Sequence, residues 1–545
     1  MVPVLPQTQT TSHKAGLLFV WVRVPVRLTT VHLPNFWPVM SLVVVLFDIG
    51  YQYTTNINTM SKVLTMQLLP PLRADGYKCD HRSQYPKGTT LVYSNATCRG
   101  SRLAGVDQAV VFGPQYWIIE HLSRRWFADF FNKPLDRVMR TYKRRIDNYL
   151  GPGAITYDHI EALHKLGYLP LCVKSLPEGT LVPMRVPYLT IRNTHPDFFW
   201  LTNMLETNLS NVVWGMVNSA TIAFTYRKQF EAFARKTGFP REMIKWMGHD
   251  FSYRGMFGED AAIMSGMAHL LSFTGTDTIP AIDGLEDYYG ANSDTELVGG
   301  SVPATEHSVM SMGGQESEID TYRRLISEVY PKGIVSVVSD TWDYFNVLDT
   351  ILPALREVIL GRDGKLVIRP DSGDPVEVIC QSMEKLWATF GGTVNEKGYK
   401  ELDPHIGLIY GDSITLERQG KILRRLEEMG FASLPVLGIG SFTYQFNTRD
   451  TLGQAIKATY GEVNGERREI FKQPKTDDGT KNSARGLLAV HRADGDLPGG
   501  RLYLKESCSW KEEAGGELLT VFMDGEVRNF QTLAQIRARV EGQLC

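Results

Sequence analysis

The sequence predicts an α/β protein with a parallel sheet in the middle of the chain and a β-rich part built from segments near both ends. Four runs rich in β-branched residues recur about 30–40 residues apart between 334 and 437, with helical segments between them, as in repeated βα units. Short strand-like runs appear instead at 170–192 and after about residue 455. A chain of 545 residues is too long for a single compact core, so at least two domains are expected.

Residues 1–65 are predicted to be an extension that the folded protein does not need. The first sixty residues hold one acidic residue, Asp48, and two apolar clusters, Leu17–Val22 and Leu42–Phe47. Each cluster has six residues, far fewer than the roughly 20 that a membrane-spanning helix needs. A signal peptide fits poorly because no charged start and cleavage pattern is clear. A start codon placed too early, ahead of Met60 or Met66, explains the segment more simply.

The folded part is expected to comprise two domains. Residues 66–195 together with 456–545 form a β-rich or mixed domain, and residues 196–455 form the α/β domain that carries the site. Helices are predicted where apolar residues recur at helical spacing, at Gln115–Phe131, 198–237, 259–272, Asp343–Leu360, Leu416–Met429 and Leu533–Val540.

Charged and small residues directly follow each predicted parallel strand. They are, in order, Asp340, the pair Arg369 and Asp371, Asp412, and the Gly438–Ser441 turn. Because the carboxyl ends of parallel strands meet at one edge, in a closed barrel or in an open doubly wound sheet, these residues are expected to share one site. Carboxylates can hold ribose hydroxyls or Mg²⁺, and a guanidinium can hold a phosphate, so the set suits a sugar phosphate. Each acid alone could instead cap the helix that follows it.

The composition argues against several other classes of function. Lys and Arg number 58 and Asp and Glu number 60, so the net charge of 58 − 60 = −2 shows no footprint for nucleic acid. The six cysteines form no CxxC pair and no zinc spacing, which indicates reduced thiols in a cytoplasmic protein. His307 belongs to no HExxH motif, and a lone histidine is more often packed or hydrogen-bonded than catalytic.

Eight short motifs stand in the order in which a known family carries them. They are Asp75–His81 with Gln84-Tyr-Pro, His249–Gly255, Gly275–Thr278, Ser301–Ser308, Ser336–Asp340, Ile368–Gly373, Gly411-Asp412 and Asn447–Asp450. On these motifs the chain resembles the nicotinamide phosphoribosyltransferases from about Arg73 to about residue 540, and its Gly438–Gln445 stretch is more similar to the bacterial and phage branch. The resemblance implies a type II phosphoribosyltransferase-like fold, which is an irregular α/β barrel with a β-rich domain built from the N- and C-terminal segments.

The resemblance also implies a role for each matching residue. Phe251 and, from a second subunit, Tyr77 would stack on the nicotinamide ring, Asp277 would accept a hydrogen bond from the carboxamide NH₂, and Arg369 and Ser339 would face its carbonyl side. Phosphate and ribose would be held by Arg254, Gly440, Ser441, Asp371 and Asp412, and Mg²⁺ with pyrophosphate by Asp343 and Asp371. Arg99, Arg449, Lys457, Lys472 and Lys481 would line the pyrophosphate and nucleotide side, some of them from the partner. His307 would be the histidine that ATP phosphorylates to improve turnover, and it is grouped with Asp371 and Arg369 as catalytic.

By this resemblance the chain makes nicotinamide mononucleotide and pyrophosphate from nicotinamide and phosphoribosyl pyrophosphate. It would be a Mg²⁺-dependent, ATP-stimulated cytoplasmic homodimer with shared active sites and with no nucleic-acid or membrane partner. Three alternatives stay open. A nicotinate phosphoribosyltransferase is the nearest, and Asp277 argues against it because an ionised carboxylate repels that of nicotinate. The others are a non-catalytic binding or signalling protein on the same scaffold, and a barrel lyase, which the lack of a strand-end lysine disfavours.

Overall fold

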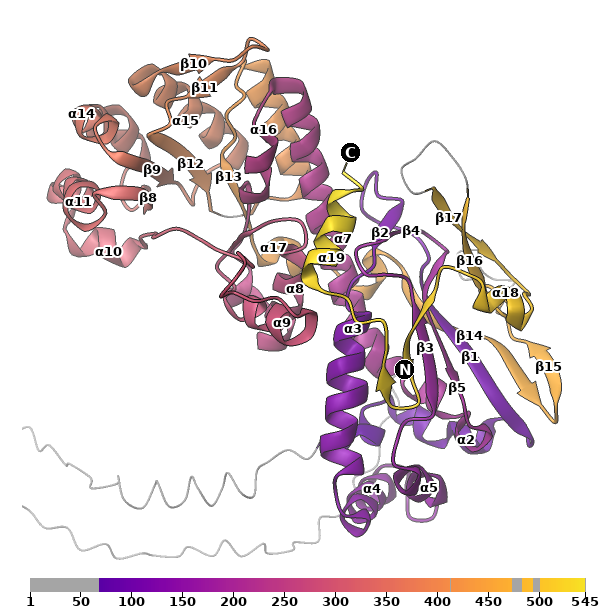
Figure 1. Ribbon diagram of the computed structural model, residues 1–545. Coiled ribbons are helices and arrows are strands. Elements are labelled where there is room, and N and C mark those ends of the chain that lie inside the picture. Colours follow the sequence, from indigo (N-terminus) through magenta and orange to yellow (C-terminus); the bar gives the residue numbers. More distant parts are fainter. Residues whose placement is uncertain (1–67, 412, 473–482, 494–499, 545) are drawn as a thin grey trace, which may run out of the picture. The chain divides into compact units, whose positions relative to one another are not determined.

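The computed structural model describes residues 68–411, 413–472, 483–493 and 500–544 (Figure 1). The predicted extension 1–65, Asp412 and Lys481 lie outside the described residues. Among the helices of the described part, none is long and apolar enough to cross a membrane.

A six-stranded parallel sheet forms the middle of the chain. Its order is β7 (Gly275–Thr276), β6 (Gly248–Asp250), β13 (Val436–Ile439), β12 (Ile406–Tyr410), β9 (Asp363–Arg369) and β8 (Lys332–Val338). Every pairing within it is parallel. The four strands predicted from β-branched runs are therefore confirmed, and they are neighbours in the sheet. The two other strands have three residues and two residues, which is too short for a periodic pattern to reveal them.

The segment from Gly300 to Thr305 closes this sheet into an irregular barrel. On one side, the Thr276 backbone N–H donates to the Gly300 carbonyl at 3.0 Å and the Gly300 N–H donates to Thr274 at 2.9 Å. On the other side, the Ser336 N–H of β8 donates to the Pro303 carbonyl at 2.9 Å, and the Thr305 N–H donates back to Ser336 at 3.0 Å. The two edge strands of the sheet are thus joined through one irregular segment. This closure favours the barrel over the open doubly wound sheet.

Apolar strand residues and the helices beside them make the core of the barrel. Figure 1 shows α15 (Pro375–Phe390) and α16 (Leu416–Glu428) next to β9, β12 and β13, and α15 and α16 contact each other. Both helices fall where helical patterns separate the strands, and Asp374 caps α15 by accepting from the backbone N–H groups of Val376 and Glu377. The strand residues in this core are almost fully buried: Val335, Val337, Leu366, Ile368, Leu408, Leu437 and Ile439.

A seven-stranded sheet combines segments from both ends of the described chain. Its order is β15 (Glu466–Glu469), β14 (Gln454–Val463), β1 (Thr89–Cys98), β5 (Pro187–Asn193), β3 (Leu171–Ser175), β18 (Leu519–Met523) and β19 (Glu526–Val527). All its pairings are antiparallel. The strands predicted within 170–192 are confirmed by β3 and β5 together with β4 (Leu181–Pro183). The limits proposed for the two domains stay a prediction, because α7 (Glu206–Thr237) contacts both β14 and α16.

The long strand β1 escaped prediction because polar residues interrupt its pattern. Ser94 and Asn95 are buried in its middle. The Ser94 hydroxyl donates to Asn203 Oδ1 at 2.8 Å, and the Asn95 side-chain NH₂ donates to the Lys457 carbonyl at 3.1 Å. Since each buried polar group has a partner, the strand is stable without an apolar run.

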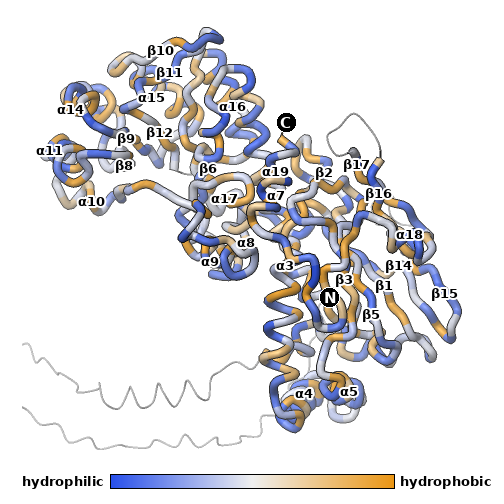
Figure 2. Tube along the Cα trace, viewed as in Figure 1, coloured by the Kyte–Doolittle hydropathy of each residue, from blue (hydrophilic) through white to orange (hydrophobic). Residues whose placement is uncertain are grey.

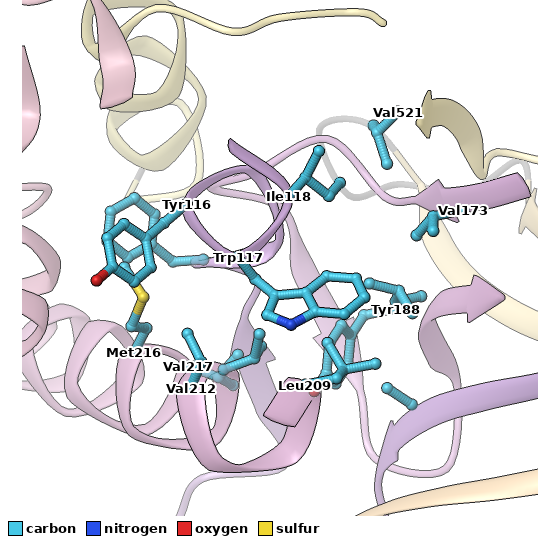
Figure 3. Close-up of a cluster of buried hydrophobic side chains, with 14 of the residues drawn as sticks. Tyr116, Trp117, Ile118, Val173, Tyr188, Leu209, Val212, Met216, Val217 and Val521 are labelled. Carbon is cyan, nitrogen blue, oxygen red and sulfur yellow. The ribbon is translucent and has the colours of Figure 1, made fainter. Parts of the chain in front are cut away.

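The helix predicted at Gln115–Phe131 is present, but most of it has π-type hydrogen bonding. It begins with α3 (Pro114–Tyr116) and continues as the π-helical segments Trp117–Arg125 and Phe127–Phe131. Figure 3 shows Trp117 in a cluster of buried side chains with Leu209 and Val212 of α7 and Tyr188 of β5. The indole N–H donates to Asn208 Oδ1 at 2.8 Å, so this large ring is buried with its polar atom satisfied.

Hydropathy follows this packing along the chain. Figure 2 shows hydrophobic residues along inner strands such as β3, whereas α16 carries many hydrophilic residues on its exposed side. The edge strand β15 is exposed along its whole length and reads Glu-Arg-Arg-Glu. Charges of this kind discourage a further strand from pairing with the sheet edge.

The predicted C-terminal helix Leu533–Val540 is confirmed as α19 (Leu533–Glu541). The predicted helices 198–237 and 259–272 correspond to α6 (Leu201–Met204), α7 and α8 (Glu259–His269). The region Asp343–Leu360 is helical but broken into α12 (Tyr344–Asn346), a π-helical turn, α13 (Leu352–Ala354) and α14 (Arg356–Leu360).

Candidate active site

A cavity of about 750 Å³ lies at the carboxyl ends of the parallel strands. Its lining residues come from the segments that follow β6, β7, β9, β12 and β13 and from the start of α10 (His307–Met312). They are Phe251, Tyr253, Arg254, Asp277, Glu306, His307, Ser308, Arg369, Asp371, Gly411, Gly440 and Ser441. Eight residues proposed from the sequence are among them: Phe251, Arg254, Asp277, His307, Arg369, Asp371, Gly440 and Ser441. The expectation that strand ends gather into one site is confirmed for Arg369, Asp371 and the Gly440–Ser441 turn, whereas Asp340 is not among the lining residues and Asp412 lies outside the described residues.

An aromatic ring and a carboxylate form one side of the cavity. The Phe251 backbone N–H donates to the Ile439 carbonyl at 3.1 Å, and the Asp277 N–H donates to the Asp250 carbonyl at 2.9 Å. Asp250 is fully buried, and its two carboxylate oxygens accept from the Ser252 N–H at 2.9 Å and the Thr278 hydroxyl at 2.8 Å. This buried acid ties together the two loops that carry Phe251 and Asp277.

The Asp277 carboxylate is held in its ionised form. Burial alone would raise its pKa, but the hydrogen bond and charge of His249, together with smaller contributions from Ser301 and Arg369, lower the pKa below the ordinary value. His249 Nε2 lies 2.9 Å from Asp277 Oδ1. An ionised carboxylate only accepts hydrogen bonds, so Asp277 presents an acceptor to the cavity.

Opposite charges meet where β9 ends. Arg369 Nε lies 3.6 Å from Asp371 Oδ1. The turn that carries Asp371 is fixed by Asp340, whose Oδ2 accepts from the Asp371 backbone N–H at 2.9 Å and from the Ser372 hydroxyl at 2.6 Å. Asp340 therefore holds the turn after β9 in place, a role different from the helix cap that its position in the sequence also allowed. Its Oδ1 lies 3.9 Å from His307 Nε2, and His307 Nδ1 lies 3.1 Å from the Thr341 hydroxyl.

Two glycines leave room for side chains of the site. A Cβ added to Gly411 would lie 1.7 Å from Asp371 Oδ1, so any larger residue there would displace that carboxylate. A Cβ added to Gly255 would lie 2.0 Å from the Ser441 hydroxyl oxygen. At Gly411 and Gly255, the absence of a Cβ lets the Asp371 and Ser441 side chains lie close to the backbone.

Two proposed residues at the barrel mouth do not line this cavity in the part of the chain that the structure describes. Ser339 is fully buried; its hydroxyl donates to the Val337 carbonyl at 2.8 Å and accepts from the Tyr322 hydroxyl at 2.8 Å. Asp343 caps α12 by accepting from the Asn346 N–H at 3.1 Å. Burial, and then the charge of Asp343, raises the pKa of Glu318 to about 7, so a second acid that the sequence did not reveal lies near Asp343.

Three of the basic residues proposed for the pyrophosphate side, Arg99, Arg449 and Lys457, lie on the antiparallel side of the molecule. Arg99 follows β1 and its Nε–H donates to the Gly453 carbonyl at 3.0 Å, while Lys457 lies on β14 opposite Asn95. Burial lowers the pKa of Lys457; Glu206 counters this effect, and the positive charges of Arg99, Lys78 and Arg449 add to it. Lys78, Arg99, Arg449 and Lys457 thus form one basic cluster. Lys78, which the sequence did not single out, pairs with Glu206 at 2.7 Å.

Tyr77 and Lys472, the two remaining proposed residues within the described ranges, are both exposed. Tyr77 is 63% exposed, and its ring lies 5.4 Å from Lys78 Nζ, beside the basic cluster. Lys472 is exposed. Within the described ranges, neither of them nor any member of the basic cluster lines the cavity.

Two family models match separate stretches of the chain. Residues 247–523 match the nicotinate phosphoribosyltransferase (NAPRTase) family, and residues 70–145 match the N-terminal domain of nicotinamide phosphoribosyltransferase. A nicotinamide phosphoribosyltransferase of Acinetobacter baylyi is 51% identical over 500 residues, which cover 87% of this chain and 97% of the relative. One of Xanthomonas campestris pv. campestris is 33% identical over 475 residues, covering 86% and 97%.

A solved structure has the same fold at low sequence identity. The nicotinate-nucleotide pyrophosphorylase from Pyrococcus furiosus aligns with a TM-score of 0.52 at 13% identity, covering 86% of this chain and 94% of that one. The likeness supports the predicted class of irregular α/β barrel joined to a second, β-rich part.

Proposed function

Since the chain belongs to the nicotinamide phosphoribosyltransferase family, we propose that it transfers the phosphoribosyl group of phosphoribosyl pyrophosphate to nicotinamide. The products are nicotinamide mononucleotide and pyrophosphate. The bond from ribose C1 to the pyrophosphate oxygen breaks, and a bond from C1 to the pyridine nitrogen forms. The leaving group takes the electron pair of the broken bond, and the ring nitrogen becomes positively charged. That nitrogen carries no proton, so the reaction needs no general base.

The observation that carries the proposal is the pairing of a base-binding side with a sugar-phosphate side in one cavity. Phe251 offers a flat face for the pyridine ring, and Asp277 offers an acceptor for the carboxamide NH₂. Arg254 and the Gly440–Ser441 turn suit the 5′-phosphate, and Asp371 suits the ribose hydroxyls. Holding both reactants in line replaces a bimolecular encounter by a positioned one.

The charges that line the cavity favour binding of nicotinamide over binding of nicotinate. An ionised Asp277 attracts the carboxamide N–H groups and repels the carboxylate of nicotinate. Arg369, which also lines the cavity and whose charge acts on Asp277, can donate to the carboxamide oxygen. Nicotinamide is therefore the proposed base and nicotinate the disfavoured one.

Mg²⁺ is the proposed metal. In phosphate-transfer sites Mg²⁺ is commonly held by one or two carboxylates together with oxygens of the substrate phosphates. The Asp371 carboxylate at the cavity wall fits this requirement, and Asp343 is the second proposed ligand. The ion would stabilise the negative charge of the departing pyrophosphate.

His307 is the proposed site of phosphorylation by ATP. Its imidazole is about half exposed and lines the cavity, so a phosphate could reach it. Asp340, 3.9 Å from Nε2, is placed to orient the ring. Phosphorylation would add negative charge beside the substrate site and so change how the diphosphate binds.

A homodimer with shared active sites is also part of the proposal. The basic cluster and the exposed ring of Tyr77 suit diphosphate binding and ring stacking, yet in the described part of the chain they lie outside the cavity. A second subunit could bring these groups to the cavity of the first.

A product assay tests the function directly. Purified full-length protein with Mg²⁺ and phosphoribosyl pyrophosphate is given nicotinamide or nicotinate, and both mononucleotides and pyrophosphate are measured. We expect nicotinamide mononucleotide as the main product, and Asp277→Ser is expected to lower the preference for the amide. A protein that used only nicotinate would be a nicotinate phosphoribosyltransferase. A protein that released no pyrophosphate from phosphoribosyl pyrophosphate in the presence of either base would be a binding protein.

A further inference from the structure

His249 lies at the point where the two base-binding groups meet. It is the central residue of β6 and is buried. Its Nε2 lies 2.9 Å from Asp277 Oδ1, and its ring lies 4.5 Å from the Phe251 ring, centroid to centroid, with an interplanar angle of 35°. One imidazole therefore contacts both the carboxylate and the aromatic face that the proposed function assigns to nicotinamide.

The hydrogen bond fixes which nitrogen of His249 carries a proton. Because the pKa of Asp277 is lowered, with burial opposed mainly by His249 itself, the carboxylate can only accept. The Nε2 atom must then donate. The other edge of the ring packs against Gly275 of β7, where an added Cβ would lie 2.7 Å from Nδ1. The imidazole is held on both edges and has little freedom to turn.

The Asp277 side chain depends on this bond more than its backbone does. Its backbone is fixed through the hydrogen bond to Asp250, but its side chain is 50% exposed to the cavity. Without His249, only the weaker contact with the Ser301 side chain would restrain such a carboxylate, which could then rotate among several rotamers. The hydrogen bond from His249 selects one rotamer of Asp277. The carboxylate has further lone pairs, which remain available to accept from an amide N–H.

We infer that His249 is a positioning residue for base selectivity: it aims the Asp277 carboxylate at the carboxamide and braces the Phe251 ring. The inference rests on the proposed function. It predicts that loss of the donor weakens binding of nicotinamide and reduces the preference for nicotinamide over nicotinate. Binding of phosphoribosyl pyrophosphate should change little, because its proposed contacts lie elsewhere in the cavity.

The test compares three replacements of His249 in the full-length protein. His249→Phe keeps a ring beside Phe251 and removes the donor, His249→Gln keeps an N–H donor without the ring, and His249→Ala removes both. Loss of a hydrogen bond to a charged group corresponds to a rise of about tenfold to hundredfold in the KM for nicotinamide. We expect this rise in His249→Phe and His249→Ala, with the KM for phosphoribosyl pyrophosphate within about twofold of wild type and with partial rescue in His249→Gln.

A matched control is available at the opposite end of the barrel. His405 precedes β12, and its Nδ1 lies 2.8 Å from Asp403 Oδ1, so it is another histidine–aspartate pair of similar length. His405→Phe should leave both KM values unchanged. Thermal unfolding of every variant shows whether the protein has folded, and if His249→Phe does not fold, His249→Gln combined with Asp277→Asn serves instead. If His249 acts through Asp277, the double variant loses little more selectivity than Asp277→Asn alone.

The possible outcomes separate the inference from the proposed function. If the wild type makes no nicotinamide mononucleotide, the proposed function fails. If the wild type is active but His249→Phe binds nicotinamide within about twofold of wild type, or raises both KM values equally, the inference is wrong.

Discussion

The parallel and antiparallel sheets of this chain carry their charged residues in different ways. In the parallel sheet, β9, β12 and β13 run in the same direction, so the residues that follow them meet in one cavity. In the antiparallel sheet, β1 and β14 run in opposite directions, and their pairing brings Arg99 close to Gly453 although 354 positions separate them in the sequence. The first arrangement lines one cavity with residues from several strand ends, and the second gathers a basic cluster none of whose members lines that cavity.

The largest expected effect is on the parallel side. Asp371→Asn removes a negative charge where the ribose and the proposed Mg²⁺ bind, and we expect kcat to fall roughly 10²- to 10³-fold. Asp349→Asn is the matched control, since Asp349 is an exposed acid paired with Lys385 at 2.6 Å away from the cavity. Steady-state kinetics of both variants check this. Equal activity of the two would mean that the cavity at the strand ends is not the reaction site.

A second change tests whether close packing at the strand ends positions the carboxylate. Gly411→Ala would put a Cβ 1.7 Å from Asp371 Oδ1, so the carboxylate must move. A displacement of this size in an active site lowers kcat/KM by about 10- to 100-fold.

Gly420→Ala is the control for the same substitution. Gly420 lies in α16, where the nearest heavy atom to an added Cβ is Gln229 Oε1 at 3.6 Å. There alanine should raise the free energy of unfolding by about 0.5–1 kcal/mol and leave activity unchanged. Full activity of Gly411→Ala would show that the position of Asp371 matters little.

The antiparallel side is expected to contribute less per residue. Lys457→Ala removes one member of the basic cluster, and we expect the KM for phosphoribosyl pyrophosphate to rise about tenfold. Lys385→Ala, at an exposed surface pair, should leave this KM unchanged. Initial rates at varied substrate concentration measure both.

Mixing the inactive variant with the weakly binding one, at a phosphoribosyl pyrophosphate concentration well below the wild-type KM, shows whether the cluster acts across a dimer. If sites are shared, a hybrid dimer of Asp371→Asn and Lys457→Ala subunits has one site with both changes and one intact site. Random exchange of subunits then restores about a quarter of wild-type activity. If each chain builds its site alone, mixing gives only the average of the two variants. The outcome decides whether the two sheets serve one site or two.

The contrast between the sheets also explains what the sequence could predict. The barrel strands were found because the run 334–338 and its three counterparts are short apolar runs with β-branched residues, and the strand-end rule then places Arg369 and Asp371 together. No such rule exists for antiparallel strands. Strand β1 was missed because Ser94 and Asn95 are buried polar residues with partners far along the chain. Tyr77 and Lys457 were proposed only through the resemblance to a family, and Lys78 and His249 became visible only in their contacts.

The smallest expected effect concerns stability in mild acid, and it too differs between the two regions. Burial lowers the pKa of three histidines to about 4. His121 and His159 contact Tyr116 and Trp200 of the core that includes the antiparallel sheet, and His269 contacts β7 of the barrel. His269 Nε2 lies 2.9 Å from the Gly275 carbonyl and its Nδ1 lies 2.7 Å from the Tyr444 hydroxyl. A histidine with a lowered folded pKa binds protons more readily in the unfolded chain, so stability falls as the pH drops from about 6.5 towards 4.

Between pH 7 and pH 5.5 each such histidine should cost about 1 kcal/mol of unfolding free energy. Urea unfolding at several pH values, followed by hydrogen exchange at pH 5.5, measures both the size and the place of the loss. With two of the three histidines on its side, the antiparallel region should open first. Earlier exchange around β6 and β7 would instead place the acid-sensitive point at His269, beside the strand that Asp277 follows, and would make the barrel the weaker half.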